Sequence, residues 1–274
     1  MRMKPRSIAI TSGKGGTGKT TLTANLGVAL GALERDTTIL DADLTMANLA
    51  LVLGMHKVES SFLDALMGRA DISDVVCRNY GIKVVPMGFR FEDVHEVLSK
   101  VKRERVEEVI KELLGETEFL LIDAPAGIAD ATIISIAAAR EMIPVTNPTY
   151  TSLVDCYKII RMANVLGSWT RGVVVNRTGK AADLTTSEVE QFMDRTLGSM
   201  PILAEIPEDP KVQEAEREGV PVVVYEPDCD ASVAINELAK VVAGGSDLPY
   251  VPYEEPAVKE TTSRLIRALT GRRV

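Results

Sequence analysis

The fold is decided by the stretch Gly13-Lys14-Gly15-Gly16-Thr17-Gly18-Lys19-Thr20, which matches the pattern G-x-x-x-x-G-K-[ST] in full. A β-branched run at 7–11 precedes it and predicts a strand, and a helical pattern follows it at 19–30. Glycines in such a turn let main-chain N–H groups curl around a phosphate, and the start of the helix adds its dipole. The stretch therefore predicts a loop that holds the phosphates of a nucleotide.

The rest of the chain alternates between strand-like and helix-like segments. Strands are predicted at 7–11, 37–41, 81–86, 119–123, 142–146, 172–176, 202–206 and 220–225. Helices are predicted at 19–30, 46–53, 61–67, 101–114, 152–166, 184–197, 210–218 and 230–242. Alternation of this kind predicts an α/β fold with a mostly parallel β-sheet flanked by helices on both faces. We expect a single P-loop NTPase domain over residues 1–246.

The composition argues against several classes of protein. The 274 residues are 46% hydrophobic and carry a net charge of −8, which disfavours a protein that coats nucleic acid through bulk charge. Cys77, Cys156 and Cys229 are more than seventy residues apart, so neither a disulfide framework nor a zinc site is predicted. No apolar run is long enough to span a membrane. The short basic segment 1–6 leads straight into a strand and does not resemble a signal peptide, so we expect a cytoplasmic protein.

The C-terminal part has a different character. A linker is predicted at 247–257, where Pro249, Pro252 and Pro256 favour an extended spacer. A basic amphipathic tail is predicted at 258–274, with a net charge of +4 that leaves −12 for residues 1–256. Its apolar residues share one helical face: Val258, Leu265, Ile266 and Leu269. Such a tail suits an anionic membrane surface, although a helix docked on its own domain and a frayed end are equally good interpretations.

Residues suited to binding phosphate and Mg²⁺ stand at the end of the loop and after two of the predicted strands. Lys19 is expected to neutralise the β- and γ-phosphates, and Thr20 to place its hydroxyl on Mg²⁺. Asp41 and Asp43 follow the strand at 37–41, where ligands bind in open α/β sheets, although one of them could instead cap a helix. Asp123 ends the apolar strand at 119–123 and is expected to hold Mg²⁺ through water.

The second lysine of the loop, Lys14, is unusual. Within the run Lys-Gly-Gly-Thr-Gly-Lys-Thr it makes the chain resemble the deviant Walker A ATPases of the MinD and ParA family. The resemblance implies an ATP-dependent homodimer in which Lys14 reaches the partner's phosphates. Residues 41–54, D-x-D-x-x-x-x-N-L-x-x-x-x-G, resemble the first switch of MinD. That implies that Asp43 orients the attacking water, that Asp41 supports Mg²⁺ or its waters, and that Asn48 belongs to the switch. Residues 123–128 resemble the second switch, where a glycine N–H senses the γ-phosphate.

The same resemblance assigns the base site. It implies that Asn176 and Arg177, at the end of the strand at 172–176, contact adenine, and that Pro207, Glu208 and Asp209 cover the base with main-chain groups. A polar strand end and an ordinary turn are the alternatives. The Asn-Lys-x-Asp pattern that reads guanine is absent from this position, so ATP is expected in preference to GTP. The implied nucleotide contacts at the loop are Gly13, Lys14, Gly15, Gly16, Thr17, Gly18, Lys19, Thr20 and Thr21.

Three functions compete within this resemblance. The first is a MinD-like ATPase at the inner face of the cell membrane that positions cell-division or other polar assemblies, which the basic tail favours. The second is a ParA-type ATPase that partitions DNA or protein cargo. The net charge of −12 on residues 1–256 argues against binding to DNA, so DNA is not the expected partner. The third is a metal-cluster carrier, which needs paired cysteines that the sequence lacks.

The resemblance also implies an activator or cargo protein. Val154 and Tyr157 stand where charged residues are common in the family, which disfavours one MinD activator type.

Overall fold

The computed structural model describes residues 5–43, 47–88, 103–127, 139–166, 168–180 and 182–244, together with Thr132 and Ser135. The predicted linker at 247–257 and tail at 258–274 lie outside the described residues, as does Ile128 of the second switch.

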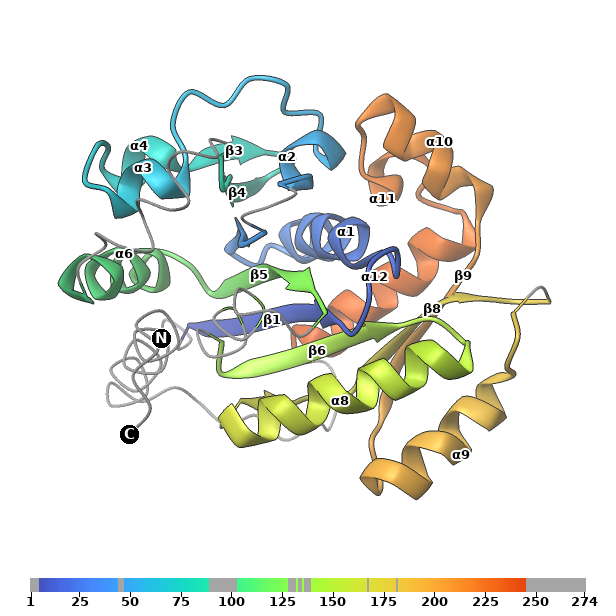
Figure 1. The fold of residues 1–274 in the computed structure, drawn as a ribbon. Helices are drawn as coiled ribbons and strands as arrows, with labels where there is room; N and C mark the ends of the chain where they lie inside the picture. The colour runs from blue at the N-terminus through green and yellow to red at the C-terminus, as the bar shows by residue number, and fades with distance from the viewer. Residues whose placement is uncertain are drawn as a thin grey trace.

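Nine strands of the described part form one sheet, in the order β3-β4-β2-β5-β1-β6-β8-β9, with β7 paired to β6 (Figure 1). The strands are β1 (Arg6–Ser12), β2 (Thr37–Asp41), β3 (Cys77–Asn79), β4 (Ile82–Val85), β5 (Phe119–Ala126), β6 (Glu141–Thr146), β7 (Trp169–Thr170), β8 (Val173–Thr178) and β9 (Ile202–Pro207). All pairs are parallel except β3 with β4. The predicted fold class, a mostly parallel α/β sheet, is confirmed.

Helices cover both faces of the sheet. One face packs against α1 (Lys19–Ala32), α2 (Leu49–Val52), α10 (Pro210–Glu218), α11 (Val222–Tyr225) and α12 (Asp230–Val242). The other packs against α3 (Phe62–Leu66), α4 (Ile72–Val75), α6 (Arg103–Gly115), α8 (Tyr150–Leu166) and α9 (Thr186–Leu197). Strand β1 alternates accordingly, since Ile8 and Ile10 join the first core and Ala9 the second. Figure 1 shows α1 and α8 on opposite sides of β1 and β6.

The prediction of a strand at 220–225 is wrong. Residues 222–225 form the short helix α11, although their β-branched composition favours a strand. Pro221 precedes the helix, and the Val223 N–H donates to Asn25 Oδ1 on α1 at 3.1 Å. The Val222 carbonyl accepts the Ser232 hydroxyl of α12 at 3.0 Å. These contacts hold the segment between two helices, so tertiary packing overrides local propensity. The short elements β3, β7 and α4 were not predicted.

A buried ionic cluster lies where the strands begin, at the amino edge of the sheet. Arg6 of β1 donates from Nε and Nη2 to the two carboxylate oxygens of Glu141, at 2.7 and 2.5 Å, and Arg171 donates from Nη1 to the same carboxylate at 3.1 Å. The two arginines also donate to the last carbonyls of α12, Arg6 to Val242 O at 2.6 Å and Arg171 to Val241 O at 3.3 Å. Positive charge at these carbonyls complements the helix dipole and fixes the end of α12.

Candidate nucleotide site

The loop between β1 and α1 leaves space for an anion. Helix α1 begins after Gly18, whose φ of 86° is left-handed, and no side chain caps its first N–H groups. A Cβ at Gly13 would collide with Asp155 of α8, and one at Gly18 with the amide of Asn176, so these two glycines permit close packing. Gly15 and Gly16 instead face open space. Uncapped N–H groups beside an open, glycine-lined hollow are suited to binding phosphate.

The predicted phosphate and magnesium residues meet at the floor of this loop. Lys19 Nζ lies 3.0 Å from Asp123 Oδ1 in a buried ion pair and donates to the Thr20 hydroxyl at 3.3 Å. The Thr23 hydroxyl of α1 donates to the same Asp123 oxygen at 3.2 Å. Lys19 therefore has Asp123 as its partner in this structure, and a bound phosphate with Mg²⁺ would give each of them a new partner.

Asp41 lies beside Asp123, because the two residues are in register on the adjacent strands β2 and β5. Burial, with the charge of Asp123 next in importance, raises the pKa of Asp41 to about 8. Burial also raises the pKa of Asp123, against the opposing effect of Lys19. Asp41 Oδ1 accepts the Asp43 N–H at 3.0 Å, whereas its buried Oδ2 has no hydrogen-bond partner among the described residues. An unsatisfied carboxylate oxygen beside a second carboxylate fits Mg²⁺ or its waters.

Lys14 points away from this cluster. Its Nζ donates to the Thr151 hydroxyl at the start of α8, over 3.5 Å and at the exposed side of the loop. On the same helix, Asp155 packs on Gly13 and forms an ion pair with Lys158 at 2.9 Å. Gly127, the glycine implied to sense the γ-phosphate, donates its N–H to Ser12 O at 2.9 Å. A γ-phosphate would therefore have to compete with Ser12 for this N–H.

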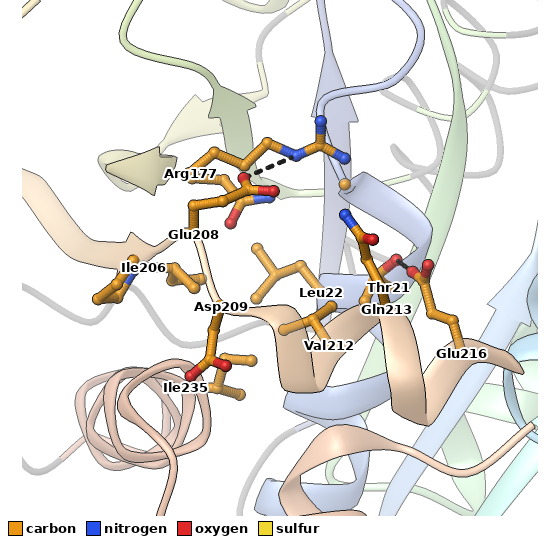
Figure 2. Close-up of a pocket in the computed structure, with 13 residues that line it drawn as sticks. Thr21, Leu22, Arg177, Ile206, Glu208, Asp209, Val212, Gln213, Glu216 and Ile235 are labelled. Carbon is orange, nitrogen blue, oxygen red and sulfur yellow. Dashed lines mark hydrogen bonds and ion pairs between the residues drawn. The ribbon is translucent and has the colours of Figure 1, made fainter. Parts of the chain in front are cut away.

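The residues predicted to bind the base line an open pocket of roughly 510 Å³ (Figure 2). Its walls are apolar around Leu22, Val212 and Ile235, and polar at the rim, where Arg177 and Glu208 form an ion pair at 3.4 Å (Figure 2). An open pocket with an apolar interior and a few polar groups at its rim suits a nucleoside.

Two of the predicted base residues also have structural roles. Asn176 Nδ2 donates to Thr17 O at 2.8 Å and so attaches the end of β8 to the phosphate loop. Asp209 caps helix α10, since its Oδ1 accepts the Lys211 N–H at 2.9 Å. The pocket therefore adjoins the phosphate loop directly at Asn176.

Helix α10 contributes two polar pocket residues that the sequence reasoning missed, Gln213 and Glu216. Glu216 accepts a hydrogen bond from the Thr21 hydroxyl of α1, and both side chains are drawn at the edge of the pocket in Figure 2. A helix is predicted at 210–218, but no sequence motif marks these two positions. Only the packing of α10 against α1 brings them to the site.

Comparison with known proteins identifies the family of the chain. A family model described as ParA, the NUBPL iron-transfer P-loop NTPase, matches residues 4–243. The chain belongs to the ParA family of P-loop NTPases. This ParA-family chain is 38% identical over 269 residues to an uncharacterized ATP-binding protein of Methanocaldococcus jannaschii, with 97% of each chain covered.

Solved structures place MinD proteins among the neighbours of this ParA-family chain. The septum site-determining protein MinD of Pyrococcus horikoshii OT3, complexed with Mg-ADP, superposes with a TM-score of 0.78 at 37% identity, covering 89% of this chain and 98% of that one. A chain of the MinC:MinD cell division protein complex of Aquifex aeolicus superposes with a TM-score of 0.76 at 28% identity, covering 91% and 100%. The resemblance to MinD inferred from the motifs is confirmed, and the Mg-ADP of the first neighbour agrees with the expected cofactors.

Within the described residues, no group of three or more His, Cys, Asp or Glu side chains is arranged to hold a metal ion. Cys156 is fully buried, and burial raises the pKa of its thiol to about 12. Across the same residues, no helix is both long and apolar enough to cross a membrane.

Proposed function

We propose that this protein is a MinD-like ATPase that hydrolyses ATP to ADP and phosphate with Mg²⁺ and dimerises when ATP is bound. The observation that carries the proposal is the place of Lys14. It belongs to the phosphate loop, yet its ammonium group contacts Thr151 at the exposed side rather than Asp123. A lysine in that position is available to the phosphates of a second copy, where it would stabilise charge that develops during transfer.

Each remaining site residue has a role in this proposal. Lys19 binds the β- and γ-phosphates after it leaves Asp123, and the N–H groups at the start of α1 hold the phosphate oxygens. Thr20, Asp41 and Asp123 would hold Mg²⁺ directly or through its waters, and the bound metal would supply positive charge to the phosphates. Asp43 lies two residues past β2, with its N–H fixed by Asp41, and its carboxylate orients the attacking water. Asn176, Arg177, Pro207, Glu208 and Asp209 surround the base.

The proposed cellular role is the positioning of cell-division or other polar assemblies from the inner face of the cell membrane. The support is the similarity to MinD structures and the basic amphipathic tail at 258–274. One such tail is expected to bind anionic lipid weakly, because the burial of four apolar side chains is nearly offset by the cost of ordering the chain. Two tails on one dimer would raise the avidity about 10²-fold or more. Hydrolysis, promoted by an activator or cargo protein, would reset the switch.

The alternative is a ParA-type ATPase that partitions DNA or protein cargo. Family membership is compatible with it. The charge of −12 on residues 1–256 disfavours a DNA-bound body, because phosphate contacts need a concentration of Lys and Arg.

The proposal is tested by measuring molar mass by light scattering, with Mg-ATP and with Mg-ADP. Asp43→Ala is expected to bind ATP, hydrolyse it slowly and accumulate as a dimer. Lys14→Ala is expected to keep nucleotide binding and remain monomeric, while Lys240→Ala, which removes an exposed lysine of α12 that pairs with Glu237 on the same helix, serves as the matched control. A monomeric Asp43→Ala protein in ATP, or a Lys14→Ala protein that dimerises like the wild type, would contradict the proposal.

A further inference from the structure

Two exposed apolar side chains lie within five residues of each other at the amino edge of the sheet. Val165 is 87% exposed in the last turn of α8, and Trp169, the single tryptophan of the chain, is 36% exposed at the start of β7. Trp169 pairs with Glu141, the first residue of β6, so both elements begin at this edge. Single exposed apolar residues are ordinary, but a pair on the edge from which the chain leaves the domain calls for an explanation.

Trp169 is linked to the exit of the chain through Arg171. The guanidinium carbon of Arg171 lies 6.0 Å from the centroid of the Trp169 ring, and its Nη2 donates to Val241 O in the last turn of α12. Arg6 holds the next carbonyl, Val242 O. The described chain ends at Gly244, and the 30 residues that follow, with the basic tail, continue from this point. The exposed indole therefore lies near the place from which the tail departs.

We propose that the amino edge around Val165 and Trp169, the tryptophan face, lies against the anionic lipid bilayer to which the tail binds. The inference rests on the proposed membrane association and adds which side of the domain faces the lipid. An indole favours the boundary between water and hydrocarbon, because its ring is apolar and its N–H is polar. Exposed Arg161, four residues before Val165 on the same side of α8, brings positive charge to the headgroups.

The candidate nucleotide site lies at the opposite, carboxyl edge of the sheet. The phosphate loop, Asp41 and Asp123 all lie at the carboxyl ends of the strands, whereas the tryptophan face lies where β6 and β7 begin. Nucleotide and a second copy at the carboxyl edge therefore leave the tryptophan face uncovered. Within α8 the single acidic residue, Asp155, belongs to the half nearer the nucleotide, so the end at Val165 carries no carboxylate that would repel anionic lipid.

The single tryptophan makes this contact directly measurable. The full chain is mixed with vesicles of phosphatidylcholine and phosphatidylglycerol, with and without brominated acyl chains, in Mg-ATP and in Mg-ADP. Sedimentation reports binding, and Trp169 emission reports contact. We expect a blue shift and quenching by brominated chains wherever the protein sediments, and neither with phosphatidylcholine alone. Protein in Mg-ATP without vesicles gives the emission change that is due to nucleotide and dimerisation.

A matched pair of variants tests the face independently of the tail. Val165→Glu places a negative charge at the bilayer and should weaken vesicle binding about fivefold, since one charge near an anionic surface is worth about 1 kcal/mol. Val233→Glu is the control, because Val233 is also an exposed valine, at 50%, but lies in the first turn of α12, far from its last carbonyls. It should bind vesicles like the wild type. Both variants should retain ATP hydrolysis in solution.

The outcomes separate the two proposals. Sedimentation with a blue-shifted, quenched Trp169, together with the Val165→Glu loss, supports the tryptophan face. Sedimentation with unchanged Trp169 emission, or equal binding of the two glutamate variants, overturns the face and leaves the membrane-binding tail in place. No sedimentation in any nucleotide overturns the membrane association and the tryptophan face with it.

Discussion

The two ends of the nucleotide site are built in different ways. At the phosphate end the functional groups are buried: Lys19 and Asp123 form an ion pair, and Asp41 keeps an unsatisfied oxygen beside them. At the base end the Arg177–Glu208 pair is half exposed over a hollow with apolar walls. Electrostatic interactions are strong where water is excluded and weak where it is not. Nucleotide affinity should therefore depend on individual side chains at the phosphate end and on the shape of the pocket at the base end.

The largest expected effect is that of Lys19→Ala. Removal of the ammonium group takes charge-assisted hydrogen bonds from the phosphates and leaves Asp123 buried without its cation, so ATP and ADP should bind about a hundredfold or more weakly. Calorimetry measures the binding, with circular dichroism as the check on folding. Lys14→Ala is the comparison, and its ADP affinity should stay within a few-fold of the wild type. Equal losses of ADP affinity in the two variants would mean that Lys14 and Lys19 contribute equally to phosphate binding within one copy.

The second effect is on pH dependence and concerns Asp41. Its pKa rises from 3.8 to about 8 in the fold, so the folded protein holds a proton that the unfolded chain loses above pH 4. The stabilisation is complete below pH 4. It falls by up to about 1.4 kcal/mol per pH unit as pH rises, and it is lost once pH exceeds the folded pKa of about 8. Melting temperatures without Mg²⁺ from pH 5 to 9 should fall less steeply for Asp41→Asn than for wild type. Parallel slopes would mean that Asp41 is charged in the folded protein.

Asn176→Ala should have an intermediate effect, because Asn176 connects the two ends. The change removes the bond to Thr17 O and the implied base contact, each worth about 1 kcal/mol, and should weaken ATP binding by up to about thirtyfold. The variant should also have a smaller ratio of ATP affinity to GTP affinity, which competition binding measures. If the preference is unchanged while affinity falls, Asn176 supports the phosphate loop and does not contact the base.

The smallest effect is expected at the rim of the base pocket. Arg177 has a φ of 61°, so Arg177→Gly keeps the backbone conformation while it removes the guanidinium group. A double-mutant cycle with Glu208→Gln should give a coupling below about 1 kcal/mol, and ATP affinity should change by less than about fivefold, as for other exposed ion pairs. A larger coupling would show that the pair closes over a bound base and is buried there.

The same contrast explains what the sequence could predict. Lys19, Thr20, Asp41 and Asp123 follow strands or open a helix at fixed spacing, so local sequence places them at one edge of a parallel sheet. Gln213 and Glu216 reach the pocket only because α10 packs against α1, which no local pattern encodes. The outward direction of Lys14 and the Gly127–Ser12 bond are likewise properties of the assembled fold.

The helical state of residues 222–225 has a consequence for local opening of the fold. The run Val222-Val223-Val224-Tyr225 is uncharged and consists of three β-branched residues and one aromatic residue, a composition that favours strand pairing when it is exposed in extended form. In the fold, the Asn25 side chain holds Val223 in a helical turn, and Pro221 cannot donate to a neighbouring strand. Local opening between α1 and α12 would therefore expose strand-favouring apolar residues that the helical turn keeps paired within the fold.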